Sequence, residues 1–368
     1  MRAEVRIPGV AVSTLTTSPY AQLELIPDGG PGTELLLRNP NRMFASKVGV
    51  GVAILLYEAS TPKSRDELEA FLRDQGVAEP GNILDALVEG GVLTSGESVE
   101  PRTRLWFDRG WRQALLFDRG VQDVTFSDIE ATRSDEGKLA LIDEYATTDG
   151  LPTYYREYDG PPFPLPEPRT LTASASEVLL GRRTCRRFER GVIPDEQEMA
   201  DILGWAFQPL RRIRDYAIAH ASEMPMLLML SSYTPFEFYC VLEGAHVPDG
   251  VYHYDIARHA LVQLRAGQYA EELRQVAIGQ VFDQVGFGGV ITADPERFMW
   301  RYRYSKGLRT IFIEAGALCQ RLITTAGALN WQSFMTPAVR DTPATELLGV
   351  DPRVEWPMYT IGFGRARG

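Results

Sequence analysis

The segment from residue 305 to residue 328 has the longest helical period of apolar residues in the chain. Its apolar positions recur every three or four residues over about six turns of a predicted helix. They are Leu308, Ile311, Phe312, Ala315, Leu318, Cys319, Leu322, Ile323 and Ala326. Because these positions cover more than one face, the helix has to be buried on several sides. The fold must therefore supply either a core around this helix or a second subunit against it.

Shorter patterns before and after this helix predict a mixed α+β domain. A capping-box pattern at residues 174–177 precedes a short helix, and Pro194 suits the first turn of the next helix. Residues 236–243 have a strand pattern, and so do residues 356–368, where the end of the strand carries Arg365. Residues 250–264 form two alternating runs around a polar turn, which predicts a hairpin. We therefore expect helices around a mostly antiparallel sheet.

The length of 368 residues exceeds the ~100–200 residues of a typical domain, so we expect two domains. Between residues 150 and 170, proline, glycine and tyrosine crowd a stretch that has no helical or strand period, which is typical of an ordered linker. We place the boundary there. The first domain, with its linker, is expected to span residues 1–165, and the second domain residues 166–368.

The first domain contains two predicted helices followed by a short strand. Ser64 and Glu67 have capping-box spacing before the first helix, and the second helix turns at Gly90-Gly91 into an apolar strand. Two helices and a hairpin in this order suggest a small winged-helix-like domain. The second helix carries acidic residues and no Lys or Arg, which argues against DNA binding. We expect this domain to dock a peptide or a protein partner, with a purely architectural role as the alternative.

Charge and cysteine content restrict the class of protein. The net charge of -11 arises in residues 1–168, which hold 16 Lys and Arg against 27 Asp and Glu, whereas residues 169–368 hold 22 of each. An acidic chain without a long basic face is a poor binder of nucleic acid. The three separated cysteines fit a reduced cytosol, and no zinc-ligand spacing is present. Because no signal peptide or membrane-length apolar run is visible either, we expect a soluble, cytoplasmic protein without a bound metal.

Residues 182–190 contain five arginines and are followed by a predicted helix that starts at a proline. Arg182 and Arg186 are four residues apart, and a second pair has the same spacing. Whether the helix continues or gives way to an extended segment near Thr184, several guanidinium groups can converge with the Thr184 hydroxyl on one small volume. Planar guanidinium donors suit a bidentate grip on phosphate, at ~1.5–3 kcal/mol for each charge-assisted hydrogen bond. The alternative from composition alone is a solvated basic surface patch.

Nitroreductase-like flavoproteins open with an Arg-x-Ser/Thr-x-Arg motif, and this chain resembles them in RRTCRRF followed by IPDEQEMADILGWAF. It also resembles a subgroup, the SagB/ThcOx-type dehydrogenases, in which a Pro-Leu-Glu segment leads a strand and a hairpin follows; the matching residues are 234–264. Residues 298–331 resemble the central helix of that subgroup, and PMYTIGFGR resembles its C-terminus. The resemblance covers residues 170–368, and an N-terminal winged-helix-like domain also fits the subgroup.

The resemblance implies an α+β fold with a long central helix and with FMN at the interface of a homodimer. In such proteins the arginine motif grips the phosphate and ribityl chain of FMN, and a loop after the long helix, here residues 330–334, lies near the flavin ring. The cofactor-binding residues implied in this way are Arg182, Arg183, Thr184, Arg186, Ser231, Ser232, Asn330, Gln332, Ser333 and Arg365.

One departure from the subgroup lies just before the Pro-Leu-Glu position. The subgroup usually has a Pro-Ser-Gly-Gly turn there, whose small residues let the backbone approach the flavin. This chain has LLMLSSYTPFE instead, in which Ser231, Ser232, Pro235 and Glu237 keep part of the pattern. Bulkier residues at a close backbone approach narrow the site.

A second departure concerns the catalytic base. Several azoline dehydrogenases have a Lys-Tyr pair before the long helix, and the aligned pair here is Arg301-Tyr302. Arginine stays protonated at any working pH, so it cannot replace lysine as a base. The remaining catalytic candidates are Tyr302, Tyr304 and Lys306. The alternative is an aromatic and basic helix start that faces solvent or a dimer partner.

The best-known reaction of the subgroup oxidises a thiazoline or oxazoline to the aromatic azole. A base takes the Cα proton, hydride leaves the neighbouring carbon for flavin N5, and O2 reoxidises the flavin. The resemblance therefore implies an FMN-dependent dehydrogenase or oxidase that modifies a peptide or carrier-bound intermediate in natural-product biosynthesis, alongside partner enzymes. The alternatives are a degenerate, non-catalytic scaffold protein and an NAD(P)H-dependent reductase of nitroaromatics or quinones.

Overall fold

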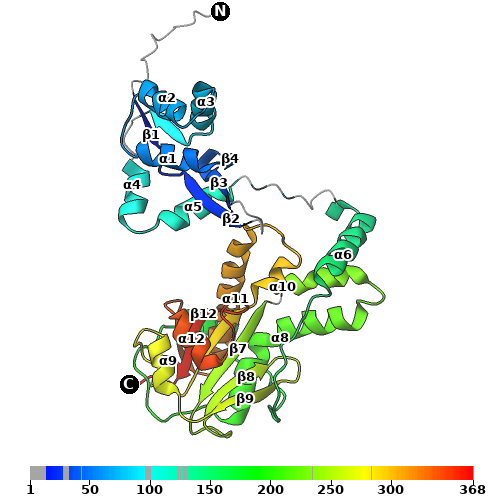
Figure 1. The fold of residues 1–368 in the computed structure, drawn as a ribbon. Coiled ribbons are helices and arrows are strands. Elements are labelled where there is room, and N and C mark those ends of the chain that lie inside the picture. Colours follow the sequence, from blue (N-terminus) through cyan, green and yellow to red (C-terminus); the bar gives the residue numbers. More distant parts are fainter. Residues whose placement is uncertain are drawn as a thin grey trace, which may run out of the picture. The chain divides into compact units, whose positions relative to one another are not determined.

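The computed structural model describes residues 14–27, 33–42, 44–95, 101–122, 124, 126, 131–233, 235–282 and 284–367. The chain forms two compact units, Met1–Thr125 and Phe126–Gly368 (Figure 1). Residues 126–165 thus pack within the second unit, upstream of the expected boundary. As a boundary between functional domains, residue 165 stays a prediction.

The first unit combines short strands with helices. Its strands β2, β3 and β4 form one antiparallel sheet, and β1 pairs with β5. The elements are β1 (Leu15–Thr17), β2 (Gln22–Pro27), β3 (Thr33–Asn39), the 3-10 helix η1 (Pro40–Arg42), β4 (Phe44–Val48), α1 (Val50–Glu58), α2 (Arg65–Asp74), α3 (Pro80–Glu89), β5 (Leu93–Ser95), α4 (Pro101–Asp108) and α5 (Arg112–Gly120).

The helices of the first unit follow the expected order, but β5 pairs with a strand that lies outside the predicted hairpin. α2 begins at the capping box of Ser64 and Glu67, and α3 leads through Gly90 and Gly91 into β5. β5 then pairs antiparallel with β1, so its partner strand comes from the start of the chain. The next described residues after β5 form α4, a helix.

The second unit is built on a seven-stranded sheet in which all neighbouring strands are antiparallel, in the order β11-β12-β10-β7-β8-β9-β6. This confirms the predicted α+β class. The elements are η2 (Ala131–Arg133), α6 (Asp135–Asp149), β6 (Pro162–Pro164), α7 (Ala175–Gly181), α8 (Glu196–His220), η3 (Pro225–Tyr233), β7 (Phe236–Leu242), β8 (Gly250–Asp255), β9 (Ala260–Ala266), α9 (Ala270–Val276), β10 (Phe287–Ala293), α10 (Pro295–Met299), α11 (Gly307–Ala328), β11 (Gln332–Thr336), α12 (Asp341–Leu348) and β12 (Trp356–Gly364).

Three local expectations need correction. The stretch interpreted as a linker contains β6, which pairs with β9 at the edge of the sheet. Pro194 precedes the first turn of α8, because Asp195 is the N-cap and accepts a hydrogen bond from the Glu198 N–H. The predicted loop at residues 330–334 is mostly strand, since β11 starts at Gln332 and pairs with β12.

The sheet is buried on both faces. Side chains of α8 and α11 pack against one face, and side chains of α9 and α12 pack against the other. β7 is therefore buried along its whole length, with alternate residues in the two core layers. On α11, Phe312 and Ile313 stay 53% and 69% exposed, so part of its apolar surface is left uncovered within this chain. Within the described ranges, no helix is long and apolar enough to cross a bilayer.

Buried charges connect the sheet with α8 and α10. Glu237 of β7 is 1% exposed and accepts hydrogen bonds from Arg297 Nη1 and from His253 Nε2, the latter at 3.0 Å. Arg214 of α8 is fully buried, with Nη2 3.8 Å from Glu237 Oε1. Burial by itself raises the pKa of Glu237, but the charges of Arg297 and Arg214 and the His253 hydrogen bond outweigh it and hold that pKa well below its ordinary value.

A second group of buried charges holds the segment before β6 in place through Arg156. Arg156 contacts Asp294 Oδ2 through Nη2 at 3.1 Å and Glu355 Oε2 through Nη1 at 3.0 Å. Glu355 is fully buried and also accepts a hydrogen bond from the Thr292 hydroxyl. Each acidic side chain in this group therefore has a cationic or hydroxyl partner, as buried charges require.

We predict that Glu237→Gln lowers the free energy of unfolding by about 3–5 kcal/mol at neutral pH, because Arg297 and Arg214 are left as uncompensated buried charges. The ordinary pKa of this carboxyl is 4.5 and its folded-state pKa is lowered, so its contribution is present above pH 4.5 and is lost as the pH falls toward the folded-state pKa. Denaturant unfolding across this pH range checks both points. Glu223→Gln, at an exposed glutamate, serves as the control, and equal losses in the two variants would contradict the prediction.

Candidate functional site

A pocket of about 470 Å³ lies in the second unit where α7, the end of α11 and the start of β11 meet. We refer to it as the α7–α11 pocket. Five residues from the set of expected cofactor-binding residues line it, although they come from two segments far apart in the chain. The lining residues are Thr172, Ala173, Glu177, Val178, Gly181, Arg182, Arg183, Ile323, Gly327, Ala328, Asn330, Trp331, Gln332 and Ser333.

The arginine segment, residues 182–188, runs as extended chain beside β11. α7 ends at Gly181, and Arg182 is its C-cap with φ -58° and ψ 126°. Thr184 then forms a parallel bridge with Ser333, and the Cys185 N–H donates to the Ser333 carbonyl at 2.9 Å. The side chains therefore alternate between two sides of an extended strand, rather than converging at helical spacing.

The arginines of this segment have different surroundings. Arg182 lines the pocket and has no ion-pair or hydrogen-bond partner for its guanidinium among the described residues. Arg183 donates through Nη1 to the Leu180 and Arg182 carbonyls at 2.7 and 2.8 Å. The Cζ atom of Arg186 lies 5.7 Å from the centre of the Phe334 ring, and neither Arg186 nor Thr184 is among the lining residues.

The opposite wall comes from the end of α11 and the first residues of β11. Asn330 has φ 60°, a left-handed conformation that asparagine tolerates, and this residue turns the chain from the helix into the strand. The side chains of Asn330, Gln332 and Ser333 bond to no other described residue. Their amide and hydroxyl groups are therefore available to a molecule in the pocket.

Arg365 fixes this turn from outside the pocket. Its Nη1 donates to the carbonyls of Leu329 and Asn330 at 3.2 and 2.6 Å, and its Nη2 pairs with Glu198 Oε1 at 2.9 Å. Its Cζ lies 4.2 Å from the centre of the Trp331 ring. Arg365 thus satisfies carbonyls at the end of α11 and links them to α8. The phosphate contact expected of Arg365 stays a prediction.

One acidic side chain also borders the pocket. Glu177 accepts hydrogen bonds from the backbone N–H of Ser174, at 2.8 Å, and from its hydroxyl. These two bonds lower the pKa of Glu177, so the carboxylate stays ionised at neutral pH. Its negative charge repels an anion, so an anion in the pocket is favoured near Arg182, at the end of α7, rather than near Glu177 in the first turn of that helix.

The expected catalytic residues lie at the other end of α11. Tyr302, Tyr304 and Lys306 precede the first residue of the helix, whereas Asn330 follows its last residue. Since α11 has 22 residues and rises 1.5 Å per residue, the two groups are separated by about 33 Å. Ser231 and Ser232 belong to η3, which precedes the β7 end farthest from the α7–α11 pocket; their side chains lie outside the described residues.

The residues before α11 form an aromatic and cationic cluster. The rings of Tyr302 and Tyr304 are 5.7 Å apart, and Phe298 packs against Tyr302 at 4.8 Å. Arg301 Cζ lies 5.0 Å from the centre of the Tyr302 ring, and Lys306 Nζ lies 5.7 Å from the centre of the Phe126 ring. A single chain therefore does not bring the proposed catalytic and cofactor-binding residues together.

The pocket also includes residues that sequence reasoning did not single out. Thr172 lies in the extended stretch before α7, and Gly327 lies in the last turn of α11. For Gly327, the sequence offers only the signal of a small residue near the end of an apolar helix. A Cβ added at Gly327 would lie 3.6 Å from Val178 Cγ1. Trp331 is 2% exposed and sits between two of the expected residues. In the described part of the chain, no cluster of His, Cys, Asp and Glu could hold a metal ion.

The sequence model of the nitroreductase family matches residues 179–365, slightly more than half of the chain. The chain belongs to the nitroreductase family. The matched range begins inside α7 and ends at Arg365, so it includes the arginine segment, α11 and β11. Ten of the fourteen residues that line the α7–α11 pocket thus lie within the nitroreductase match.

Two relatives from Rhizobium leguminosarum bv. trifolii match beyond the nitroreductase range. The trifolitoxin operon protein TfxC is 25% identical over 366 residues, which cover 94% of this chain and 99% of that protein. The trifolitoxin-processing protein TfxB is 24% identical over 318 residues, which cover 80% of this chain and 82% of that protein. Among solved structures, the E. coli microcin synthetase McbBCD complex with truncated pro-MccB17 bound contains a chain with a TM-score of 0.40 and 16% identity, covering 66% of this chain and 99% of that chain.

We predict that Arg365→Gln destabilises this nitroreductase-family chain by ~2 kcal/mol, because the charge-assisted bonds to two carbonyls and to Glu198 are lost. Denaturant unfolding gives the free energy, and hydrogen exchange should show faster exchange in β11. The matched control is Arg353→Gln, since the Arg353 side chain is 86% exposed and, among the described residues, pairs with its near neighbour Asp351 alone. Equal effects of the two substitutions would rule out the stabilising role assigned to Arg365.

Proposed function

We propose that the chain is an FMN-dependent dehydrogenase or oxidase that modifies a peptide or carrier-bound intermediate in natural-product biosynthesis. Membership of the nitroreductase family supports an oxidoreductase. The observation that carries the proposal is the α7–α11 pocket, which is lined by Arg182, Arg183, Asn330, Gln332 and Ser333. These residues offer guanidinium donors on one wall and amide and hydroxyl groups on the other.

The α7–α11 pocket fits a mononucleotide in size and chemistry. Its volume of about 470 Å³ falls within the ~300–1,000 Å³ of small-molecule and cofactor sites. The guanidinium of Arg182 has no partner in the described structure, so binding a phosphate there breaks no existing ion pair. The free side chains of Asn330, Gln332 and Ser333 suit the polar edge of a flavin ring or its ribityl chain. Of the residues proposed to hold the phosphate, Arg182 and Arg183 line the pocket, whereas Thr184 and Arg186 lie in the same extended segment outside its lining.

FMN bound there would supply the two-electron chemistry, accepting a hydride from the substrate and passing the electrons to O2, which leaves as hydrogen peroxide. For an azoline substrate, the neighbouring carbon loses the hydride, Cα loses a proton, and a carbon–carbon double bond forms between them. The Cα proton goes to a base, for which Tyr302, Tyr304 and Lys306 are our candidates. Arginine donors near the ring would stabilise the negative charge that develops there.

The relatives support the proposed substrate class. TfxC is named as a trifolitoxin operon protein and TfxB as a trifolitoxin-processing protein, and both resemble this chain over most of its length. We propose that this chain likewise acts on a peptide or carrier-bound substrate, in the manner of the SagB/ThcOx-type dehydrogenases. In this proposal it works in the cytoplasm beside other enzymes of one biosynthetic pathway.

A homodimer would bring the residues at the two ends of α11 together in one site. The catalytic candidates and the α7–α11 pocket are about 33 Å apart within one chain, so a complete site requires a second copy that brings its own helix start to the pocket. The exposed Phe312 and Ile313 on α11 and the exposed Leu179 and Leu180 on α7 offer apolar surface for such a contact. We therefore propose FMN at the interface of two copies.

The FMN proposal predicts that Arg182→Gln combined with Arg183→Gln weakens FMN binding at least about tenfold, because each charge-assisted bond contributes ~1.5–3 kcal/mol and ~1.4 kcal/mol corresponds to a factor of ten. Quenching of flavin fluorescence on titration of the FMN-free protein measures the dissociation constant. Arg212→Gln removes an exposed arginine of α8 outside the pocket and should leave it unchanged. Unaltered FMN affinity in the double variant would refute the assignment.

The dimer proposal predicts complementation between two inactive variants. One chain carries Arg182→Gln and Arg183→Gln, and the other carries Tyr302→Phe, Tyr304→Phe and Lys306→Met. In a mixed dimer one of the two sites receives intact residues from both chains, so activity should return, whereas each variant alone stays inactive. If mixing restores no activity although native mass spectrometry detects mixed dimers, the shared site is refuted.

A second candidate function is a non-catalytic nitroreductase-like scaffold in the same kind of pathway. It is favoured by Arg301, which stands where several azoline dehydrogenases have lysine. A scaffold would take up no FMN and would keep pathway output when Arg182 and Arg183 are both replaced. A third candidate, an NAD(P)H-dependent nitro or quinone reductase, would instead show rapid flavin reduction by NAD(P)H without a peptide.

A further inference from the structure

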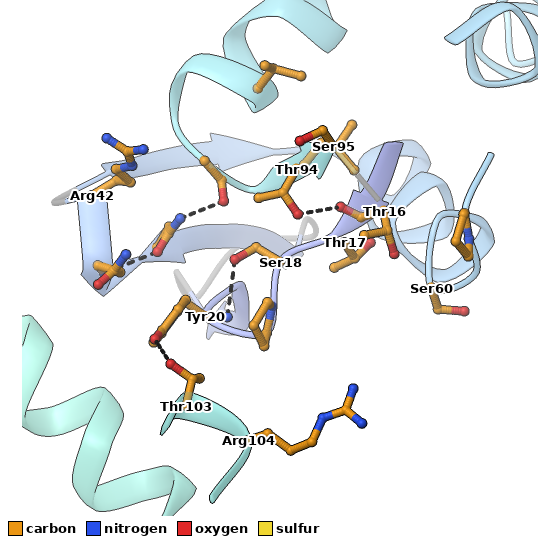
Figure 2. Close-up of a pocket in the computed structure, with 17 residues that line it drawn as sticks. Thr16, Thr17, Ser18, Tyr20, Arg42, Ser60, Thr94, Ser95, Thr103 and Arg104 are labelled. Atoms are coloured by element: carbon orange, nitrogen blue, oxygen red, sulfur yellow. Dashed lines mark hydrogen bonds between the residues drawn. The ribbon is translucent and has the colours of Figure 1, made fainter. Parts of the chain in front are cut away.

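The first unit contains a pocket of its own, with a volume of about 800 Å³ (Figure 2). We call it the hydroxyl groove, because Ser and Thr side chains line much of it. Its walls come from β1, β5, the turn after β1, the end of η1 and the start of α4. All of these elements belong to the first unit, so the groove is formed within that unit alone.

Hydrogen bonds among the lining residues fix the groove wall. The Tyr20 and Thr103 hydroxyls are 2.7 Å apart and join the turn after β1 to α4. The buried Asn39 donates through Nδ2 to the Gly90 and Gly91 carbonyls at 3.0 and 2.7 Å. These bonds hold the β3–η1 corner against the turn that leads into β5, so the groove wall is set before any ligand arrives.

Two arginines of the groove are unpaired. Arg42 and Arg104 are exposed, and neither makes an ion pair or a side-chain hydrogen bond with any described residue. Gly91 has φ +63°, and a Cβ there would lie 2.8 Å from Arg42 Cγ, so the Arg42 stem lies close over the glycine turn. In the view of Figure 2, the hydroxyls of Ser18 and Tyr20 lie between Arg42 and Arg104.

One strand edge in the groove is also unpaired. Thr16 of β1 and Thr94 of β5 lie directly opposite, while the flanking Leu15 exchanges its backbone bonds with Lys63 on the other side of β1. Along a strand of an antiparallel pair, the backbone N–H and C=O groups point alternately toward the partner strand and away from it. The N–H and C=O groups of Leu93 and Ser95 therefore point away from β1. No described strand pairs with this outer edge of β5.

The chemistry of the groove favours a particular ligand. The groove presents two separate arginines rather than a continuous basic face, so it is a poor site for nucleic acid. Two separate arginines instead match two separate carboxylates. Backbone groups on an open strand edge match the backbone of an extended chain. Small-molecule sites, in contrast, are mostly apolar and enclose their ligand.

We propose that the hydroxyl groove binds an extended acidic peptide segment, which adds as a strand to the outer edge of β5 and places carboxylates at Arg42 and Arg104. The identification of this peptide as part of the substrate rests on the proposed function, whereas its binding in the groove does not. The proposal assigns substrate recognition to the first unit and names acidic side chains as the feature recognised.

The test uses the full chain and a fluorescein-labelled peptide in which glutamate alternates with threonine, followed by fluorescence anisotropy. We expect binding, a loss of at least about tenfold in affinity for Arg42→Gln combined with Arg104→Gln, and a similar loss when glutamine replaces glutamate in the peptide. Arg109→Gln, an exposed arginine of the same unit outside the groove, should bind like the unmodified chain.

Several results would overturn the proposal. Equal affinity for the glutamate and glutamine peptides would exclude carboxylate recognition, and full competition by inorganic phosphate at low concentration would identify a simple anion site. Binding that occurs only in a chain lacking residues 1–13 would mean that the chain's own N-terminal segment fills the groove. FMN affinity, measured in the same samples, should be unchanged by Arg42→Gln and Arg104→Gln, so failure of FMN binding and failure of peptide binding remain distinguishable.

Discussion

The packing of α11 against the sheet is the constraint on which the arrangement of the second unit depends. Leu318, Cys319 and Leu322 of this helix are fully buried in the same core layer as α8 and one face of the sheet. The two ends of this helix carry the two sets of residues assigned to the proposed redox site. The proposed contribution of a partner copy therefore depends on helix length rather than on any single side chain.

A cluster of buried charges connects β7 with β8, α8 and α10 in the second unit. The charged groups of this cluster are Glu237, Arg297 and Arg214. A buried cluster of this kind is stable only when each charge has a partner of opposite charge or a hydrogen bond. Glu237 follows Pro235, in the position where the SagB/ThcOx-type subgroup has its Pro-Leu-Glu glutamate. In this structure the glutamate is enclosed by arginines and His253, so its observed role is to hold β7, β8 and α10 in register.

Much of the second unit could be predicted from the sequence because its patterns are local. The capping box at Ser174, the hairpin of β8 and β9 and the long helix depend on residues close in the chain, and all three are present. The sequence leaves the course of the arginine segment open between helix and extended chain, because the extended course depends on pairing between Thr184 and the distant Ser333. The partner of β5 could not be predicted, because β1 lies far upstream, and neither could the role of Arg365 at the carbonyls that end α11.

The position of Arg156 has a consequence for any dissection of this protein. Arg156 lies upstream of residue 166, yet it is the cation that faces the fully buried Glu355 and also Asp294. A fragment cut at residue 166 would also lack β6, leaving the β9 edge bare. The flavoprotein-like half should therefore be excised at residue 126, where the contacts within the chain divide, so that each carboxylate keeps its counter-ion.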